Sequence, residues 1–315
     1  MITFQGNFAK HLADYVRLRR SLGLKFKDQE RVLLAFDQFV AERDYQGTLT
    51  QELALEFATA KQGISPNRSA YRYQVVRHFS DYLATFVPST PQLDSTVLRR
   101  PRTRPPAYIF TEEQLNMLLH EAIHISTYNP LRGIALHAMV GLAASTGMRL
   151  GEVIRLDRGD VDLDSGVLLI KQTKFAKDRL VPVHSSTREI LCGYASTRDA
   201  AFPSAWTPAF FINMSCRRFA KQTLEASFLE LTQRSGLRAA HDKGPSFHSL
   251  RHSFAVRRLI AWYKAGMDVQ AMLPALATYM GHVNYTDTAY YLTATAELLG
   301  LAAEKLQAGV EEVPS

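Results

Sequence analysis

The chain has 315 residues, of which 46% are hydrophobic and 21% are charged. This length and composition exclude a small protein held together by disulfides or metal, and they exclude a disordered or fibrous chain; two globular domains are expected. Lys and Arg number 37 against 30 Asp and Glu, and the formal net charge of +7 favours a polyanionic partner.

The cysteines and the apolar runs bear on where the protein acts. Cys192 and Cys216 have no CxxC spacing, so neither a disulfide framework nor a zinc ribbon is expected. Residues 1–20 lack the apolar stretch of a signal peptide, and the longest apolar run, 133–144, is too short to span a bilayer. We expect a soluble, cytoplasmic, nucleoid-associated protein with no membrane partner.

The first part of the chain has apolar residues at the three-to-four spacing of helices. This pattern predicts four helices, at roughly 7–22, 27–43, 50–60 and 66–86. Glycines and a Pro-containing stretch separate them, and no strand pattern interrupts them. A helical bundle domain is expected over residues 1–88.

Residues 89–108 are rich in Pro, Ser and Arg and show no apolar periodicity, which predicts a linker. A basic, extended linker could follow a phosphate backbone, although a solvated linker explains the charge equally well. The candidate DNA-contacting residues of this linker are Arg99, Arg100, Arg102 and Arg104.

A second domain is expected over residues 109–300, followed by a tail at 301–315. Thr111 and Gln114 have the spacing of a capping box, and further helices are expected at about 130–145 and from Ser246 to about Lys264. Pro274 suits the first turn of another helix. Residues 161–184 read as short strands, so the predicted fold is mainly α with a small antiparallel β-sheet.

The first candidate constellation lies at the start of the helix that follows Ser246. His248 and Arg251 are three residues apart and share a face, where an arginine fork and a histidine suit a single phosphate. Taken alone, such a pair is usually an ordinary surface pair. His252 also lies four residues after His248, but Ser249 replaces the glutamate that an HExxH zinc site uses, so no metal site is predicted.

The second constellation is the Thr-Gly-Met-Arg turn at 146–149. It can aim Arg149 into a cleft while Glu152, one helical turn later, braces it. A purely structural ion pair is the alternative. A third candidate is a lysine of the hairpin, Lys171, Lys174 or Lys177, that could donate a proton to a leaving oxygen, although exposed hairpin lysines commonly serve solubility.

The last segment holds His282 and two adjacent tyrosines, Tyr290 and Tyr291. Neighbouring helical residues point about 100° apart, so only one of these tyrosines can face a given site. Tyrosines near the end of a chain are usually core or interface residues.

In their order along the chain, these four segments resemble those of the tyrosine recombinases, or phage integrase family, over residues 110 to 300. The resemblance matches six positions to the family's active site and one to its supporting acid: Arg149, Lys174, His248, Arg251, His282 and Tyr291, with Glu152 as the acid. Lys174 is preferred over its neighbours by its distance from the Arg-Leu-Val-Pro stretch at 179–182. Tyr291 is preferred over Tyr290 because it follows His282 by nine residues and precedes Leu292.

The resemblance implies a DNA strand-exchange recombinase of the integrase or transposon type, with a helical core-binding bundle and an α+β catalytic domain. Its tyrosine would form a 3′-phosphotyrosine and free a 5′-hydroxyl, without metal or cofactor. Its partners would be double-stranded DNA with specific recombination sites, a tetramer of copies on that DNA, and other recombinases or accessory proteins.

Three other classes of protein are alternatives. A catalytically idle DNA-binding protein on the same fold should have lost some of the six residues, and a type IB topoisomerase would relax supercoils without a defined site. A metal-dependent transposase or nuclease would need a clustered acidic triad, for which Asp160, Asp162 and Asp164 are poor candidates.

Overall fold

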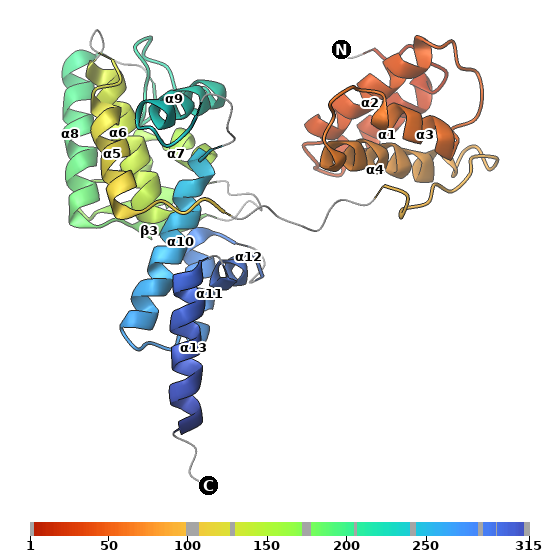
Figure 1. Ribbon diagram of the computed structural model, residues 1–315. Helices are drawn as coiled ribbons and strands as arrows, with labels where there is room; N and C mark the ends of the chain where they lie inside the picture. Colours follow the sequence, from red (N-terminus) through yellow and green to blue (C-terminus); the bar gives the residue numbers. More distant parts are fainter. Residues whose placement is uncertain are drawn as a thin grey trace. The chain divides into compact units, whose positions relative to one another are not determined.

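Figure 1 shows the computed structural model of the chain, which forms two compact units, Met1–Pro105 and Pro106–Ser315. The structure describes residues 3–98, 107–126, 130–171, 178–204, 207–239, 244–282, 286–293 and 295–311. Among the helices it describes, none combines the length and the apolar character needed to cross a membrane.

The first unit is a four-helix bundle, as the periodicity predicts. Its helices are α1 (Ala9–Ser21), α2 (Lys27–Ala41), α3 (Gln51–Thr59) and α4 (Pro66–Leu83). Thr50 and Ser65 cap α3 and α4 by accepting hydrogen bonds from backbone amides of the first turn. Aromatic side chains dominate the core, and Phe36, Phe57 and Phe79 are completely buried.

Residues 89–98, which the sequence assigned to a linker, pack against this bundle. Leu93 is buried among the core residues of the first unit. The hydroxyl of Tyr73 donates a hydrogen bond of 2.8 Å to the carbonyl oxygen of Asp94, whose amide donates to Gln51. The four candidate linker arginines, within 99–106, lie outside the described residues.

The second unit is mainly helical with a small antiparallel sheet, so the predicted fold class is confirmed. Its α-helices are α5 (Glu112–Ile123), α6 (Pro130–Thr146), α7 (Leu150–Arg155), α8 (Ser185–Ala201), α9 (Lys221–Arg234), α10 (Phe247–Lys264), α11 (Val269–Met280), α12 (Thr286–Ala289) and α13 (Ala296–Glu311). Two 3₁₀ turns complete the described helical elements, η1 (Arg158–Asp160) and η2 (Tyr290–Thr293).

The sheet has the strand order β1-β2-β3, with β1 (Val161–Asp162), β2 (Val167–Ile170) and β3 (Arg179–Pro182). Both pairings are antiparallel. The Asp-Ser-Gly turn joins β1 to β2, and Asp162 accepts two backbone hydrogen bonds there. Arg179 pairs with Ile170 at the far end of the hairpin.

Helix α10 joins the two hydrophobic cores of this unit. Phe247 and Leu250 belong to the core that α6 fills, beside α5 and α8 (Figure 1). Phe254 and Leu259 belong to a second core with α11, η2 and α13. Arg251 therefore lies on α10 between the residues that enter each core, which explains how a charged side chain comes to be deeply buried.

Two cap predictions for this unit had different outcomes. The capping box of Thr111 and Gln114 is present, with hydrogen bonds of 3.2 and 3.1 Å. Pro274 was expected in the first turn of its helix, and this was wrong. Asp268 caps α11 by accepting from two backbone amides, so the helix begins five residues before the proline.

Candidate active site

The Thr-Gly-Met-Arg turn connects α6 to α7 and places Arg149 at the N-cap of α7. Gly147 has a φ of +65°, and a Cβ there would come within 2.6 Å of the ring of Phe254. Glycine is therefore needed both for the backbone conformation and for the close approach of α10. Glu152 accepts from the Arg149 side chain at 2.9 Å and from its backbone amide at 3.0 Å.

Arg251 reaches this turn from α10 and is 1% exposed. Its guanidinium donates to the carbonyl oxygen of Gly147 at 2.6 Å and to that of Met280 at 2.8 Å. Burial and the nearby charge of Arg149 lower the pKa of Arg251 to about 10, so it remains a cation at neutral pH. The residue thus ties the α6–α7 turn to the end of α11.

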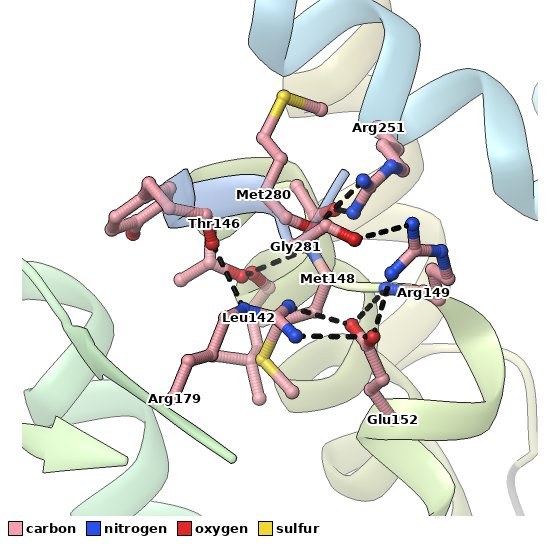
Figure 2. Close-up of polar contacts among 11 residues, drawn as sticks. Leu142, Thr146, Met148, Arg149, Glu152, Arg179, Arg251, Met280 and Gly281 are labelled. Atoms are coloured by element: carbon pink, nitrogen blue, oxygen red, sulfur yellow. Dashed lines mark hydrogen bonds and ion pairs between the residues drawn. The ribbon is translucent and has the colours of Figure 1, made fainter. Parts of the chain in front are cut away.

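Three arginines converge on the last carbonyl groups of α11 (Figure 2). Arg179 donates to the carbonyl of Tyr279 at 2.9 Å, and Arg149 donates to that of Gly281 at 3.0 Å. With Arg251 on Met280, three successive backbone oxygens each receive a different guanidinium. These carbonyls lack intrahelical partners and lie at the negative end of the helix dipole, so clustered cations are favoured there.

Glu152 is the anion that this cluster shares. Figure 2 shows Arg179 donating to both oxygens of Glu152. The two hydrogen bonds are 2.8 and 3.2 Å long, and the Glu152 side chain is only 2% exposed. Burial by itself would raise the pKa of Glu152, but the hydrogen bonds and charges of Arg179 and Arg149 outweigh burial and lower it to about 2. The carboxylate is therefore ionised throughout the physiological range.

His248 and His252 stand one turn apart on α10, with ring centroids separated by 4.5 Å and planes at 84°. Burial, followed by the neighbouring His252 and arginines, lowers the pKa of His248 to about 4. Burial and Arg251 also lower the pKa of His252. Both rings are neutral at pH 7, a state in which an imidazole can accept a proton.

His282 follows Gly281, which ends α11 in the left-handed conformation with a φ of +68°. Its Nδ1 shares a hydrogen bond of 2.7 Å with the hydroxyl of Thr288. Burial and the charge of Arg251 lower the pKa of His282 to about 3, so this ring too is neutral at pH 7.

Tyr291 lies in η2 and is 2% exposed. Its ring stacks on His282, with centroids 6.2 Å apart, and meets His252 edge-on at 5.3 Å. Burial raises the pKa of Tyr291, while the charge and hydrogen bonding of Arg251 oppose that rise. The structure thus brings Arg149, Glu152, His248, Arg251, His282 and Tyr291 into one cluster.

Tyr290 is the tyrosine next to Tyr291 in the chain. It is partly exposed, and its ring lies 6.4 Å from His252 and 5.8 Å from Tyr291. Tyr291 is buried, and its phenol interacts with Arg251 and Arg149. The geometry therefore favours Tyr291 as the tyrosine of this site.

Of the three candidate hairpin lysines, the structure describes Lys171. Lys174 and Lys177 fall within 172–177, outside the described residues. Lys171 forms an ion pair of 2.5 Å with the buried carboxylate of Asp160. Within the described ranges, no three His, Cys, Asp or Glu side chains gather as a metal site would require.

A cavity of about 530 Å³ adjoins Arg149 and His248. Lys221 and Arg238 add positive charge to its lining, and Phe228 forms part of its apolar wall. These residues belong to 185–245, a segment to which the sequence analysis assigned no chemistry. For Lys221 and Arg238, positive charge is the only signal in the sequence that could have predicted a place at this cavity, and many other surface residues share that charge.

The family model described as "Phage integrase family" matches residues 109–297. The chain belongs to the phage integrase family. It is 44% identical over 302 residues to a Sinorhizobium fredii protein named "Putative integrase/recombinase y4rE", covering 95% of this chain and 96% of that one. It is 32% identical over 168 residues to tyrosine recombinase XerA of Thermococcus kodakarensis, covering 53% and 54%.

Solved structures share the fold of this integrase-family chain. The Tn1549 transposon integrase in complex with a circular intermediate DNA gives a TM-score of 0.69 at 17% identity, covering 94% of this chain and 99% of that one. The XerH recombinase bound to a palindromic difH substrate gives 0.67 at 18% identity, covering 89% and 79%. The family resemblance drawn from the sequence is confirmed.

Proposed function

We propose that this protein is a site-specific DNA recombinase that cleaves and rejoins strands through a 3′-phosphotyrosine at Tyr291. The observation that carries this proposal is the packing of Tyr291 beside two neutral histidines and two arginine cations, Arg149 and Arg251. The histidines beside Tyr291 are His252 and His282, and His248 lies against His252 as a further neutral imidazole. Together these residues supply a nucleophile, a proton acceptor and charge to stabilise a phosphoryl transition state.

The reaction is a transesterification. The phenolic oxygen of Tyr291 forms a bond to phosphorus as the bond to the 5′-oxygen breaks, and the phenolic proton passes to His248 or to the phosphate. Lys174 protonates the leaving 5′-oxygen. A 5′-hydroxyl from a partner strand later reverses these steps, so no bond energy is lost to hydrolysis.

The arginines and His282 act on the phosphate itself. Arg149 and Arg251 bind the non-bridging oxygens and balance the charge that develops on them. Each keeps further N–H groups beyond those bonded to backbone carbonyls, since a guanidinium has five donors. His282 donates a hydrogen bond to a non-bridging oxygen, and Glu152 holds Arg149 in place.

The charge that a metal ion would otherwise supply comes from these guanidinium groups, so the reaction is proposed to be metal-independent. Their positions are fixed by backbone carbonyls and by Glu152 before DNA arrives, which avoids reorganisation during the reaction.

The partner is proposed to be duplex DNA carrying a defined recombination site. The net charge of +7 and the cations around the cavity suit a phosphate backbone. The XerH and Tn1549 integrase structures hold DNA substrates. By that likeness, we propose that the bundle and the catalytic unit together bind one duplex, with linker arginines on its phosphates.

Recombination joins two duplexes, so four protomers are proposed to act together on DNA at the nucleoid, with accessory proteins or other recombinases as further partners. The apolar helix pattern of residues 297–306 is proposed to dock on a neighbouring protomer. Packing on its own unit remains the alternative for the tail.

A suicide substrate tests this function when it is built from the DNA ends of the mobile element that encodes the protein. A covalent protein–DNA complex that matures into recombinant product supports it. Relaxation of a supercoiled plasmid of random sequence would instead indicate a topoisomerase, and DNA binding without any adduct would indicate an idle DNA-binding protein.

A further inference from the structure

Arg179, the first residue of the Arg-Leu-Val-Pro stretch, is held inside the candidate active site. It begins β3 and its side chain is 11% exposed. Its side chain donates three hydrogen bonds there, two to Glu152 and one to the carbonyl oxygen of Tyr279.

Its first partner is Glu152, which it binds in a two-pronged manner at 2.8 and 3.2 Å. A fork of this kind fixes both the position and the plane of a carboxylate. Since Glu152 in turn accepts from the side chain and the amide of Arg149, the plane of that carboxylate determines where Arg149 points.

Its second partner is the carbonyl oxygen of Tyr279, at 2.9 Å from Nε. This carbonyl is two residues before Gly281 and three before His282. The backbone at Gly281 also packs on Arg179, because a Cβ there would lie 2.8 Å from Nη1 and 3.0 Å from Cζ. One guanidinium therefore supports the Arg149 side of the site and the His282 side together.

We propose that Arg179 is a positioning residue of the cleavage site, which orients Arg149 through Glu152 and fixes the turn that carries His282 through the Tyr279 carbonyl. The inference rests on the proposed function. Lysine cannot replace it, because a single ammonium cannot bind two carboxylate oxygens in a plane and a backbone carbonyl beside them.

The experiment compares Arg179→Met and Arg179→Lys with Arg188→Met, an exposed cation of the neighbouring helix α8. Adduct formation on a suicide substrate is followed at saturating DNA, and DNA affinity is measured separately. We expect the cleavage rate constant of both Arg179 variants to fall about 10- to 100-fold, with less than about threefold change in affinity. Arg188→Met is expected to match the wild type.

A pH profile separates positioning from a general loss of structure. Without Arg179, the pKa of Glu152 rises, so the cleavage rate of Arg179→Met should fall at a higher pH than that of the wild type. The double variant Arg179→Met/Glu152→Gln lacks the titrating carboxyl group. Its cleavage rate should therefore no longer fall at this higher pH. Wild-type rates and profiles in both Arg179 variants would overturn the proposal.

A measurement that needs no catalysis separates this inference from the proposed function. In the wild type, the two ends of the Arg149 guanidinium are held by Glu152 and Gly281, so its NMR signals should show slow rotation. The separate signals of the two ends should merge in Arg179→Met. The signals that disappear in Arg149→Lys are those of Arg149. Retained slow rotation in Arg179→Met overturns the inference, whereas averaging in Arg179→Met combined with a wild type that forms no adduct overturns the proposed function alone.

Discussion

Arg149 and Glu152 are joined twice, once through the guanidinium at 2.9 Å and once through the backbone amide at 3.0 Å. The carboxylate therefore acts as the helix cap of α7 and as the counter-ion of a proposed catalytic cation. An anion at a helix N-terminus is favoured by the helix dipole, and the same anion holds the arginine in a fixed direction.

Removing that carboxylate should change acid stability. The pKa of Glu152 is about 2 in the folded protein against about 4.5 when unfolded, so its contribution is complete above pH 4.5 and is lost as pH falls toward 2. This difference in pKa corresponds to about 3 kcal/mol of folding free energy. Unfolding of Glu152→Gln, followed by denaturant titration, should show a smaller pH slope in that window.

An exposed glutamate on α8 provides the matched control. Glu189→Gln removes the same charge from the surface and should keep the wild-type slope. Identical slopes for Glu152→Gln and the wild type would mean that Glu152 carries no such stabilisation. Glu152→Gln should also be less stable at pH 7 by about 3–5 kcal/mol, because Arg179 keeps a buried charge without its partner.

The pKa of His248 near 4 predicts the pH dependence of cleavage. A proton acceptor must be neutral, so the rate at subsaturating DNA should stay level from pH 8 to about 5 and fall as the ring protonates near pH 4. Quenched-flow cleavage across this range measures the profile. In His248→Gln the rate should be low and its acid limb absent, and an unchanged acid limb would assign the titration to another group.

Gly281→Ala should disturb the end of α11 in two ways. Its φ of +68° costs a residue with a Cβ about 1–2 kcal/mol, and that Cβ would also collide with Arg179. Gly266 has the same φ with open space around it, so Gly266→Ala reports the backbone cost alone. Thermal unfolding should therefore show a larger loss for Gly281→Ala, and equal losses would argue against a tight approach of Arg179.

Chelation offers a separate check on the proposed chemistry. Cleavage of a suicide substrate should proceed at the same rate with excess EDTA, because the guanidinium groups of Arg149 and Arg251 provide the positive charge. Adduct yield on denaturing gels measures this outcome. A loss of cleavage in chelator that added magnesium restores would contradict a metal-independent reaction.

The sequence was sufficient for features determined by neighbouring residues. Helix periodicity predicted the four helices of the bundle to within about three residues at their ends, and the box of Thr111 and Gln114 formed as expected. The ordered motifs identified the family and selected residues that cluster in space. For residues on one helix, the spacing in the sequence determines whether the side chains share a face, as for His248 and Arg251.

Contacts between residues far apart in the sequence could not be predicted from local patterns. Arg179 meets Glu152 across 27 residues and Tyr279 across 100, and a lone arginine before a strand has no local pattern that predicts either contact. The packing of Leu93 on the bundle was missed because proline and serine around it suggest a linker. Pro274 was misplaced because the capping carboxylate of Asp268 determines where α11 begins.

Substitution of the two tyrosines separates binding from chemistry. Tyr291→Phe removes only the attacking oxygen, so it should bind the recombination site with an affinity within about threefold of the wild type and form no adduct. Tyr290→Phe should bind and cleave. Gel-shift and denaturing gels measure the two properties, and cleavage by Tyr291→Phe would transfer the role to another residue.

The most direct test of the central claim is identification of the residue bonded to DNA. The wild-type adduct formed on a suicide substrate is digested with protease and nuclease, and the nucleotide-bearing peptide is sequenced by mass spectrometry. The account predicts a phosphodiester on Tyr291 joined to the 3′ side of the cleaved strand. Attachment at any other residue, or to a 5′ phosphate, would contradict it.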